Sequence, residues 1–267
     1  MPEHPVVLRA VRGTSLGLQS LAGARQVRMG QRFEHSANLE VTGPAGRPMV
    51  VNLTDDVCCP LQVMLDEASQ AVVEQTWAPG AVVHVETEGA GRVQMQTPFT
   101  GPIDPGPAVT MAQPWLARSW FSSEDGRLFG QPALRRALAG EVDALMGLGA
   151  GLTPAGDDVL VGWIAWHRAV TGSAEQFEHL DDASVGATTR TSSSLLAAAL
   201  AGETGRAVNN MLGALRSHDM ALLQQSVDRL AQHGSSSGAD ALYGLHALWT
   251  RPSALPLDGR RRTQEVS

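Results

Sequence analysis

Two kinds of hydrophobic pattern divide the chain. In roughly the first hundred residues, short apolar runs alternate with turns such as Gly43-Pro44 and Pro79-Gly80, a pattern typical of β-strands. Further along, apolar residues recur every three or four positions, as one face of a helix requires. We therefore predict an α+β protein with a β-rich region over 1–107, an all-helical region over 108–250 that carries the functional site, and a flexible tail over 251–267.

The β-rich region contains one ambiguous run and five expected strands. The apolar run from Leu61 to Val73 fits either a helix or a bent strand. The segment Pro98–Pro107 has four prolines in ten residues, which precludes regular structure and marks the end of this region. The strands are predicted at Gln26–Met29, Asn38–Thr42, Pro48–Leu53, Ala81–Thr87 and Arg92–Thr97.

Several stretches of the second region predict helices. Two apolar runs bounded by glycine are expected to be helical, Ser193–Leu200 and Arg206–Leu215. Two further sets of apolar residues have the spacing of a single helix face; they are Leu134, Leu138, Val142 and Leu145, and Met220, Leu223, Val227 and Leu230.

One segment of the helical region occurs twice, at Thr153–Ala165 and at Ser235–Ala247. Both copies have a hydroxyl residue, Gly three positions later and Asp two positions after that, followed by Leu, Gly and Ala at matching offsets. The helices that follow are apolar nearly all round, so they should be buried centrally. We interpret this internal helix-start repeat as two related halves that face a shared site.

A purely structural explanation of the repeat stays open beside the functional one. Thr153 and Ser235 are good helix N-caps, and Pro154 suits the first helical position. On this explanation the repeat consists of two capped, closely packed helices.

The functional explanation rests on residues that capping does not need. The run Gly147–Gly151 offers free backbone N–H groups to an anion. Asp157 and Asp158 place two carboxylates side by side, where Mg²⁺ would neutralise them. The second copy keeps one of these carboxylates, as Asp240.

Composition limits the possible chemistry. The net charge of −7 argues against a nucleic-acid partner, and no apolar stretch of about 18 residues predicts a membrane span. We expect a cytoplasmic protein, because the N-terminus lacks a signal-peptide core. All 20 basic residues are arginine, which excludes a Schiff-base or P-loop lysine. A bound anion must therefore be held by arginine, backbone N–H groups or a metal.

The two cysteines, Cys58 and Cys59, are adjacent in the sequence. They fit either a redox or metal site or, the simpler interpretation, two small buried thiols. No Cys–His pair is expected from the spacing of these residues.

A third helix start, Thr188–Ser194, combines hydroxyls, free N–H groups and one arginine, which together suit an oxyanion. A Ser/Thr-rich first turn of a helix explains it equally well. On the enzymatic interpretation the residues fall into two sets. The catalytic candidates, with the first two as tentative metal ligands, are Asp157, Asp158 and Asp240. The anion-binding candidates are Gly149, Gly151, Thr153, Gly156, Thr189, Arg190, Thr191, Ser192, Ser237 and Gly238.

The string Gly147–Asp158 resembles the hallmark of a bacterial domain-of-unknown-function family, Gly-Leu-Thr-Pro-Ser-Gly-Asp-Asp, with Ala155 in place of Ser. The family also tends to show a Thr-Thr-x-x-Ser helix start, matched at Thr188–Ser192, and a Gly-x-Ser-Ser-Gly-x-Asp segment, matched at Gly234–Asp240. This family includes the oxamate carbamoyltransferase subunit of anaerobic allantoin degradation, a part of purine catabolism.

The resemblance implies a function. Such complexes make carbamoyl phosphate and oxamate from oxalurate and phosphate, and they need other subunits of unrelated sequence. We therefore expect a subunit of a carbamoyltransferase that acts on a small anionic metabolite and associates with other subunits or with copies of itself. Two alternatives remain, a non-catalytic structural or regulatory subunit and a metal-dependent hydrolase.

Overall fold

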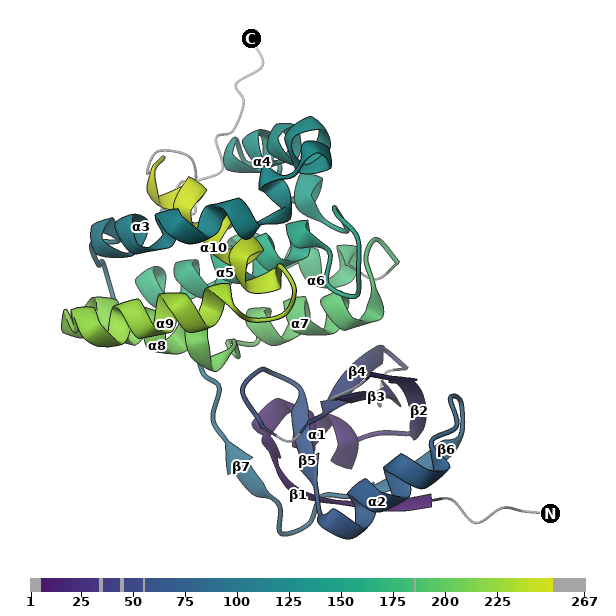
Figure 1. Cartoon of the computed structure of the whole chain (residues 1–267). Coiled ribbons are helices and arrows are strands. Elements are labelled where there is room, and N and C mark those ends of the chain that lie inside the picture. Colours follow the sequence, from purple (N-terminus) through teal and green to yellow (C-terminus); the bar gives the residue numbers. More distant parts are fainter. Residues whose placement is uncertain (1–5, 34–35, 44–45, 55, 185, 252–267) are drawn as a thin grey trace.

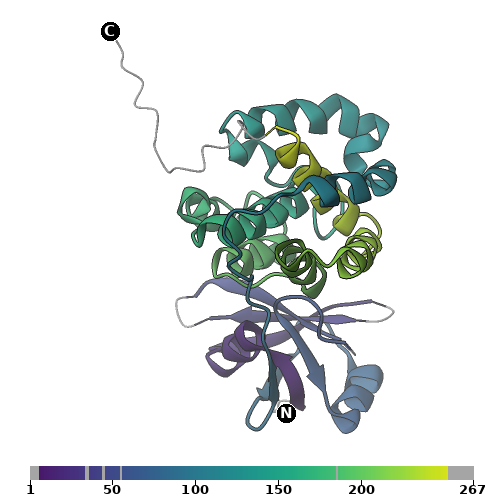
Figure 2. The same cartoon turned by 90° about the vertical axis from the view of Figure 1, so that its left-hand side faces the viewer.

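The computed structural model describes residues 6–33, 36–43, 46–54, 56–184 and 186–251. A β-rich N-terminal region lies beneath a helical C-terminal region (Figure 1), so the predicted α+β class is confirmed. Figure 2 shows the connecting segment running from the strands up to the helices across the face turned toward the viewer. Most of the predicted tail, residues 252–267, lies outside the described residues.

The strands of the N-terminal region form a barrel of six strands. They follow the order β5-β4-β3-β2-β6-β1, and an antiparallel β1–β5 pairing closes the ring; β7 pairs with the end of β1. Inward-facing side chains such as Leu8, Leu39 and Val63 form its core. The strands are β1 Val6–Thr14, β2 Gln26–Arg32, β3 Ala37–Thr42, β4 Pro48–Leu53, β5 Gln62–Leu65, β6 Val82–Glu86 and β7 Gly91–Val93.

Strands β2, β3, β4 and β6 lie where the sequence predicts them, whereas other parts of the barrel differ. The ambiguous run from Leu61 is a strand and then a helix, β5 followed by α2 (Glu67–Thr76), because Asp66 accepts a hydrogen bond from Ser69 N and caps that helix. The predicted strand Arg92–Thr97 is shorter and ends at Val93. The sequence analysis missed β1 and α1 (Ser15–Ala22).

The helical region contains the predicted helices and several short connecting turns. No helix of the described residues is long and apolar enough to cross a membrane. The α-helices are α3 Gly106–Ala112, α4 Gln131–Leu138, α5 Ala155–Thr171, α6 His179–Ala183, α7 Arg190–Leu200, α8 Arg206–Ser217, α9 Met220–Ala231 and α10 Ser237–Trp249. Short 3-10 turns lie at Gln113–Arg118, Trp120–Ser122, Val142–Leu145 and Glu175–Phe177, and a π-helical turn at Gly126–Gly130.

One predicted helix face is divided in the structure. Leu134 and Leu138 belong to α4, whereas Val142 and Leu145 belong to a separate 3-10 turn. Gly140, with φ 111°, ends the first helix in a conformation that favours glycine. All four apolar side chains are nevertheless buried, so the spacing identified core residues although it did not identify a single helix.

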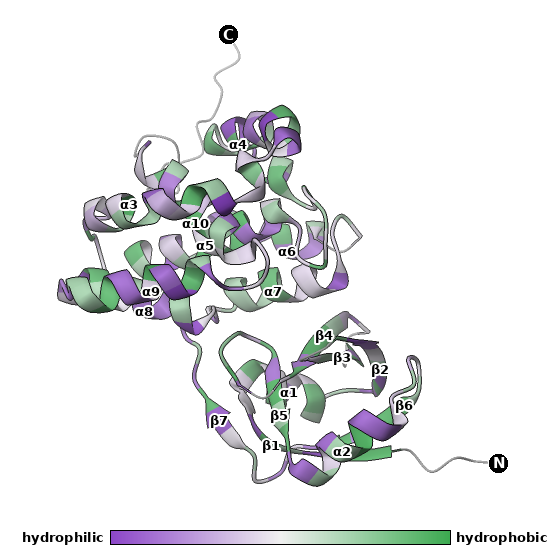
Figure 3. Cartoon of the chain, in the orientation of Figure 1, coloured by the Kyte–Doolittle hydropathy of each residue, from purple (hydrophilic) through white to green (hydrophobic). Residues whose placement is uncertain are grey.

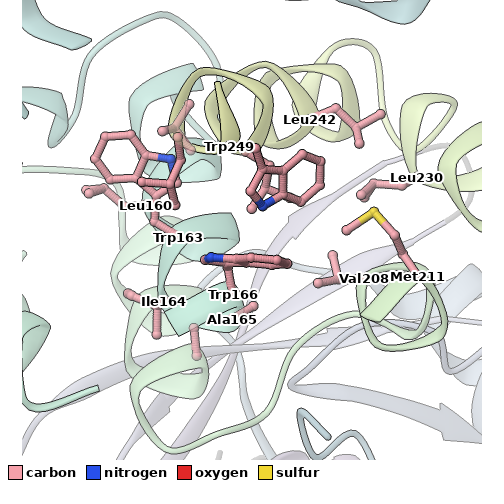
Figure 4. Close-up of a cluster of buried hydrophobic side chains, with 14 of the residues drawn as sticks. Leu160, Trp163, Ile164, Ala165, Trp166, Val208, Met211, Leu230, Leu242 and Trp249 are labelled. Atoms are coloured by element: carbon pink, nitrogen blue, oxygen red, sulfur yellow. The ribbon is translucent and has the colours of Figure 1, made fainter. Parts of the chain in front are cut away.

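Helices α5 and α10 lie at the centre of the helical region, as the repeat predicts. Trp163 is completely buried between them, and its indole N–H donates to the Gly244 carbonyl at 2.8 Å. Figure 4 shows the apolar cluster around these helices, in which Trp166 of α5 lies beneath Trp249 of α10. The outer helices α4 and α9 alternate hydrophilic and hydrophobic segments, as amphipathic surface helices do (Figure 3).

The barrel contacts the helical region through α6, α7 and α8. The Val50 N–H of β4 donates to the Ser194 hydroxyl of α7 at 2.9 Å. Arg47, beyond β3, forms an ion pair with Asp181 of α6 that uses both terminal guanidinium nitrogens. A backbone bond of 2.8 Å joins Arg206 N, at the start of α8, to the Cys58 carbonyl. These contacts bring the β4–β5 loop against the starts of several helices.

Candidate functional site

A cavity of about 610 Å³ lies where the β4–β5 loop meets the helical region. Five helices line it. Four of them contribute residues of their first two turns or of the segment just before them, whereas α9 contributes Arg229 and Leu230 of its last turn, with His233 just beyond. The residues at the four helix starts include Thr153 and Asp158 at α5, Thr191 and Leu195 on α7, Gly205 to Val208 at α8, and Ser237 and Gly238 on α10. The barrel contributes Asn52, Asp56, Cys58, Cys59, Pro60 and Gln62.

This convergence of helix starts gives the cavity a preference for negative charge. The first turn of a helix has backbone N–H groups without intrahelical partners, and its macrodipole places partial positive charge there. Helix α8 follows Gly205, which supplies no side-chain cap. The Arg206 N–H of its first turn is bonded to the Cys58 carbonyl, and no capping side chain occupies the N–H groups that follow. Arg206 adds a full positive charge beside them and lies 3.8 Å from Asp56. Four helix starts, Arg206 and Arg229 therefore favour a small anion, whereas Asp56 and the C-terminal end of α9 oppose it.

Asp158, the fourth residue of α5, is the acidic residue from the repeat that lines the cavity. Its Oδ2 atom is buried and has no hydrogen-bond partner. Burial raises the pKa of this carboxyl well above its usual range, and the neighbouring Asp240 carboxylate raises it further. Hydrogen bonding from the Ser237 and Thr153 hydroxyls partly opposes that shift. The side chain can therefore keep a proton at a pH at which an ordinary aspartate has lost it.

Asp240, its counterpart on α10, does not reach the cavity wall. The residue is completely buried, and its Oδ1 accepts hydrogen bonds from the Ser119 hydroxyl and from Trp120 N–H, both at 2.7 Å. Burial raises its pKa as well. Asp240 thus holds the 3-10 turns after α3 against α10 and acts on the cavity through Asp158.

Asp157 is likewise used within the protein. Its Oδ1 accepts the Gly147 N–H at 2.9 Å, and its Oδ2 accepts the hydroxyl of Thr188. Both oxygens are therefore engaged, and Asp157 and Asp158 do not present a joint set of free ligands. No group of three or more His, Cys, Asp or Glu side chains within the described residues could hold a metal ion. The donor set does not fit the Mg²⁺ that the paired carboxylates suggested.

The glycine-rich loop before α5 has a conformational role. Gly147, Gly149 and Gly151 have φ of 68°, 109° and 102°, in the left-handed region that favours glycine. The N–H of Gly147 is bonded to Asp157, and that of Gly156 donates to the Leu148 carbonyl at 2.8 Å. Gly149, Gly151 and Gly156 are not among the residues that line the cavity.

The expected N-caps are wrong. Helix α5 begins after Pro154 and α10 after Ser236, and neither N-cap residue makes a side-chain capping bond. Instead, the Thr153 hydroxyl lies 2.8 Å from the hydroxyl of Ser237. The two copies of the repeat are therefore joined to each other at the point where both reach the cavity.

Helix packing explains why both copies of the repeat have glycine at the same position. A Cβ atom on Gly156 would lie 1.9 Å from the Leu145 carbonyl oxygen, and one on its counterpart Gly238 would lie 1.6 Å from the Leu230 carbonyl oxygen. In both copies the start of the helix therefore packs directly against the end of the preceding helical segment. The repeat is a helix–turn–helix unit rather than only a helix start.

The four predicted anion-binding residues at the start of α7 lie in different environments. Thr189 caps the helix by accepting Ser192 N–H at 3.1 Å and donates its hydroxyl proton to the Leu152 carbonyl. Arg190 turns toward the barrel, where it pairs with Glu40 at 3.0 Å. The Ser192 hydroxyl is buried without a partner. Of the four candidates at this helix start, only Thr191 lines the cavity.

A Cys–His pair, which was not expected, forms in the cavity. The Cys59 sulfur lies 3.5 Å from His233 Nε2, although 174 positions separate the two residues in the sequence. The Cys58 sulfur lies 3.9 Å from that of Cys59. The adjacent cysteines were the available signal in the sequence, whereas nothing in the spacing of His233 indicated this contact.

Residues 145–249 match a family model described as oxamate carbamoyltransferase subunit AllH. The resemblance suggested by the motifs is thereby confirmed for this segment. No curated protein and no solved structure matches the chain.

The match to the AllH family model covers the residues of only one wall of the cavity. It covers α5, α7, α8, α9 and α10, and with them Asp158, Thr191 and Arg206. The barrel, including the loop with Cys58 and Cys59, lies outside the matched residues. The cavity is therefore built from a family-matched helical wall and a barrel wall about which the match says nothing.

Proposed function

We propose that this chain is a subunit of an oxamate carbamoyltransferase-type complex and that its cavity binds the small anionic carbamoyl donor. The observation that carries the proposal is Asp158, a buried carboxyl with a raised pKa and an unpartnered oxygen, at a cavity surrounded by helix N-termini. This residue lies in the segment that matches the family. The proposal includes association with other protein subunits, as the name of the matched family implies.

The chemistry of carbamoyl transfer suits these walls. Oxalurate and phosphate are both anions, and the first turns of α7 and α8, with Arg206, would orient them. As the bond between the carbamoyl carbon and the oxamate nitrogen breaks, that nitrogen needs a proton, which a protonated Asp158 can donate. Backbone N–H groups would stabilise the oxyanion that forms on the carbamoyl carbon.

Other residues of the repeat would position Asp158. The hydroxyls of Thr153 and Ser237 act on its carboxyl, and the charge of Asp240 helps to keep it protonated. Asp157 fixes the glycine loop and Thr188 around the start of α5. In this proposal Asp157 and Asp240 are positioning residues, and Asp158 is the catalytic acid.

Two measurements test the proposal. Oxamate, phosphate and carbamoyl phosphate should each raise the melting temperature of the chain, because a ligand that binds only the folded state stabilises it. With the other subunits present, oxalurate and phosphate should yield carbamoyl phosphate, and Asp158→Asn should abolish most of that turnover.

Asp125→Asn is the matched control, because Asp125 is exposed and does not line the cavity. If no ligand shifts the melting temperature and turnover does not need this chain, the proposal is refuted and a structural subunit remains.

A further inference from the structure

The loop that brings the two cysteines to the cavity is held rigidly. The Gln62 side-chain oxygen accepts the N–H groups of both Cys58 and Cys59 at 2.8 Å. From the helical side, Arg206 N donates to the Cys58 carbonyl at 2.8 Å, and the Arg206 guanidinium donates to the Val57 carbonyl. Four backbone groups beside the thiols are therefore bonded to residues outside the loop tip, two to Gln62 and two to Arg206.

The same loop carries a strained residue. Leu61 is completely buried and has φ 59°, a left-handed conformation that leucine rarely adopts. Such strain persists only where the surroundings enforce it, and it clusters at functional sites.

The surroundings of Cys58 favour its thiolate. Hydrogen bonding from the Cys59 thiol lowers the pKa of Cys58 to about 7, and the positive charge of Arg206 acts in the same direction while burial and Asp56 oppose it. Hydrogen bonding to Cys58 and burial raise the pKa of Cys59, which therefore keeps the proton that it shares with Cys58, and His233 Nε2 lies 3.5 Å from the Cys59 sulfur. A thiolate is the nucleophilic form of cysteine.

We propose that Cys58 is the nucleophile that receives the carbamoyl group from the donor in this cavity and then passes it to phosphate. This inference rests on the function proposed above and adds a covalent intermediate to it. It is based on the two thiols, whose loop is fixed by hydrogen bonds, and on His233 and Arg206 beside them. All of these residues line the same cavity as Asp158.

The step balances in atoms and electrons. The Cys58 thiolate attacks the carbamoyl carbon of oxalurate, an S–C bond forms and the C–N bond to oxamate breaks. The departing nitrogen takes a proton from Asp158, and oxamate leaves. A phosphate oxygen then attacks the thiocarbamate carbon, the S–C bond breaks, and carbamoyl phosphate and the thiolate result. The proton that phosphate loses returns to Asp158, so no oxidant or further reactant is required.

The decisive experiment omits phosphate. With the other subunits present, the complex is mixed with oxalurate and isotopically labelled oxamate. A carbamoyl–enzyme predicts that label enters oxalurate without phosphate, and that a burst of oxamate matches the amount of enzyme. Mass spectrometry of the quenched protein should find one carbamoyl group on the Cys58 peptide.

Variants separate a catalytic from a structural role. Cys58→Ala should lose the exchange, the burst and at least about 100-fold of the turnover, while oxamate and phosphate still raise its melting temperature as they do for the wild type. Cys59→Ala should keep the adduct on Cys58 and shift the pH dependence of its alkylation by iodoacetamide to higher pH.

The outcomes distinguish this inference from the proposed function. If the wild type turns over but shows no exchange and no adduct, or if Cys58→Ala turns over normally, transfer is direct; the inference is then overturned and the proposed function stands. If the wild type neither binds the anions nor turns over, both are overturned.

Discussion

The equivalent aspartates of the two repeat copies have opposite surroundings. Asp158 and Asp240 are each the fourth residue of a buried helix, α5 and α10. Each has one buried oxygen without a hydrogen-bond partner. Asp240 is completely buried, and its other oxygen accepts two hydrogen bonds of 2.7 Å, whereas Asp158 lines the cavity. A repeated motif thus places one aspartate at the cavity and the other in the protein interior, and we propose that only the first is reactive.

The two copies also differ in the residue that precedes the aspartate. Asp157 holds the glycine loop and Thr188 around the first copy, whereas its counterpart Ala239 is completely buried in the second. Only the first copy therefore has a second carboxylate that orders the loop beside it. The predictions below test whether this division of roles is correct.

The largest expected effect is on turnover. Asp158→Asn should lower kcat by about 10²–10⁴-fold, the usual contribution of a general acid, with little change in ligand binding. Asp240→Asn should lower kcat less, because it acts only through Asp158. Steady-state kinetics of the complex measure both, and equal losses in the two variants would contradict the division.

The glycines of the repeat should affect stability strongly. Gly156→Ala and Gly238→Ala place a Cβ within 1.9 Å and 1.6 Å of a carbonyl oxygen, so the free energy of unfolding should fall by about 1–3 kcal/mol or more in each. Gly213→Ala on α8 is the control, since no atom lies within 4 Å of its Cβ; it should be more stable by about 0.5–1 kcal/mol. Urea denaturation compares the three.

Asp240→Ala should destabilise the protein in a way that Asp240→Asn does not. Alanine leaves the Ser119 hydroxyl and Trp120 N–H without their acceptor, at a cost of about 1–3 kcal/mol of unfolding free energy. Asparagine keeps an acceptor oxygen at that position. Equal melting temperatures of the two variants would show that the hydrogen bonds do not matter.

The raised pKa of Asp158 gives a pH dependence with a definite sign. Above the pKa of the unfolded chain, the unfolded aspartate is ionised while the folded one still holds its proton, so stability falls as pH rises toward the folded pKa. Asp158→Asn removes this loss. The melting temperature of the variant minus that of the wild type should therefore increase from pH 4 to pH 8. A difference that is constant with pH would contradict the raised pKa of Asp158.

The smallest effect is expected from Ser237. Hydrogen bonding from its hydroxyl lowers the pKa of Asp158, so Ser237→Ala should raise that pKa and move the high-pH limb of the rate profile to higher pH. Ser235→Ala is the control, because Ser235 is exposed and does not line the cavity. Profiles of kcat against pH would detect the shift, and unchanged profiles in both variants would exclude this role.

The sequence predicted the parts of the fold that depend on local pattern. The helical spacing and the repeat located α5, α7, α8, α9 and α10, because burial of an apolar face determines those helices. It did not predict β1, which reads Val-Val-Leu-Arg-Ala-Val-Arg and is stabilised by pairing with three distant strands.

The same limit applies to the candidate site. Five of the predicted site residues line the cavity, and their catalytic or anion-binding roles stay predictions; they are Thr153, Asp158, Thr191, Ser237 and Gly238. Arg190 was proposed to hold an anion but pairs with Glu40 of the barrel, because only the tertiary arrangement shows where its long side chain lies. The contact of Cys59 with His233 likewise depends on how the barrel docks. Local motifs identified the helical wall of the cavity, whereas only the structure revealed the wall that the barrel forms.

Because α5, α7, α8 and α10 all start at the cavity, binding of a small anion there should depend only weakly on ionic strength. The whole chain carries a net charge of −7, which repels an anion at long range. Within the cavity, however, the field of peptide dipoles has the opposite sign, and the surrounding protein shields it from counterions. A negatively charged metabolite should thus be retained at ionic strengths that would release it from exposed arginines.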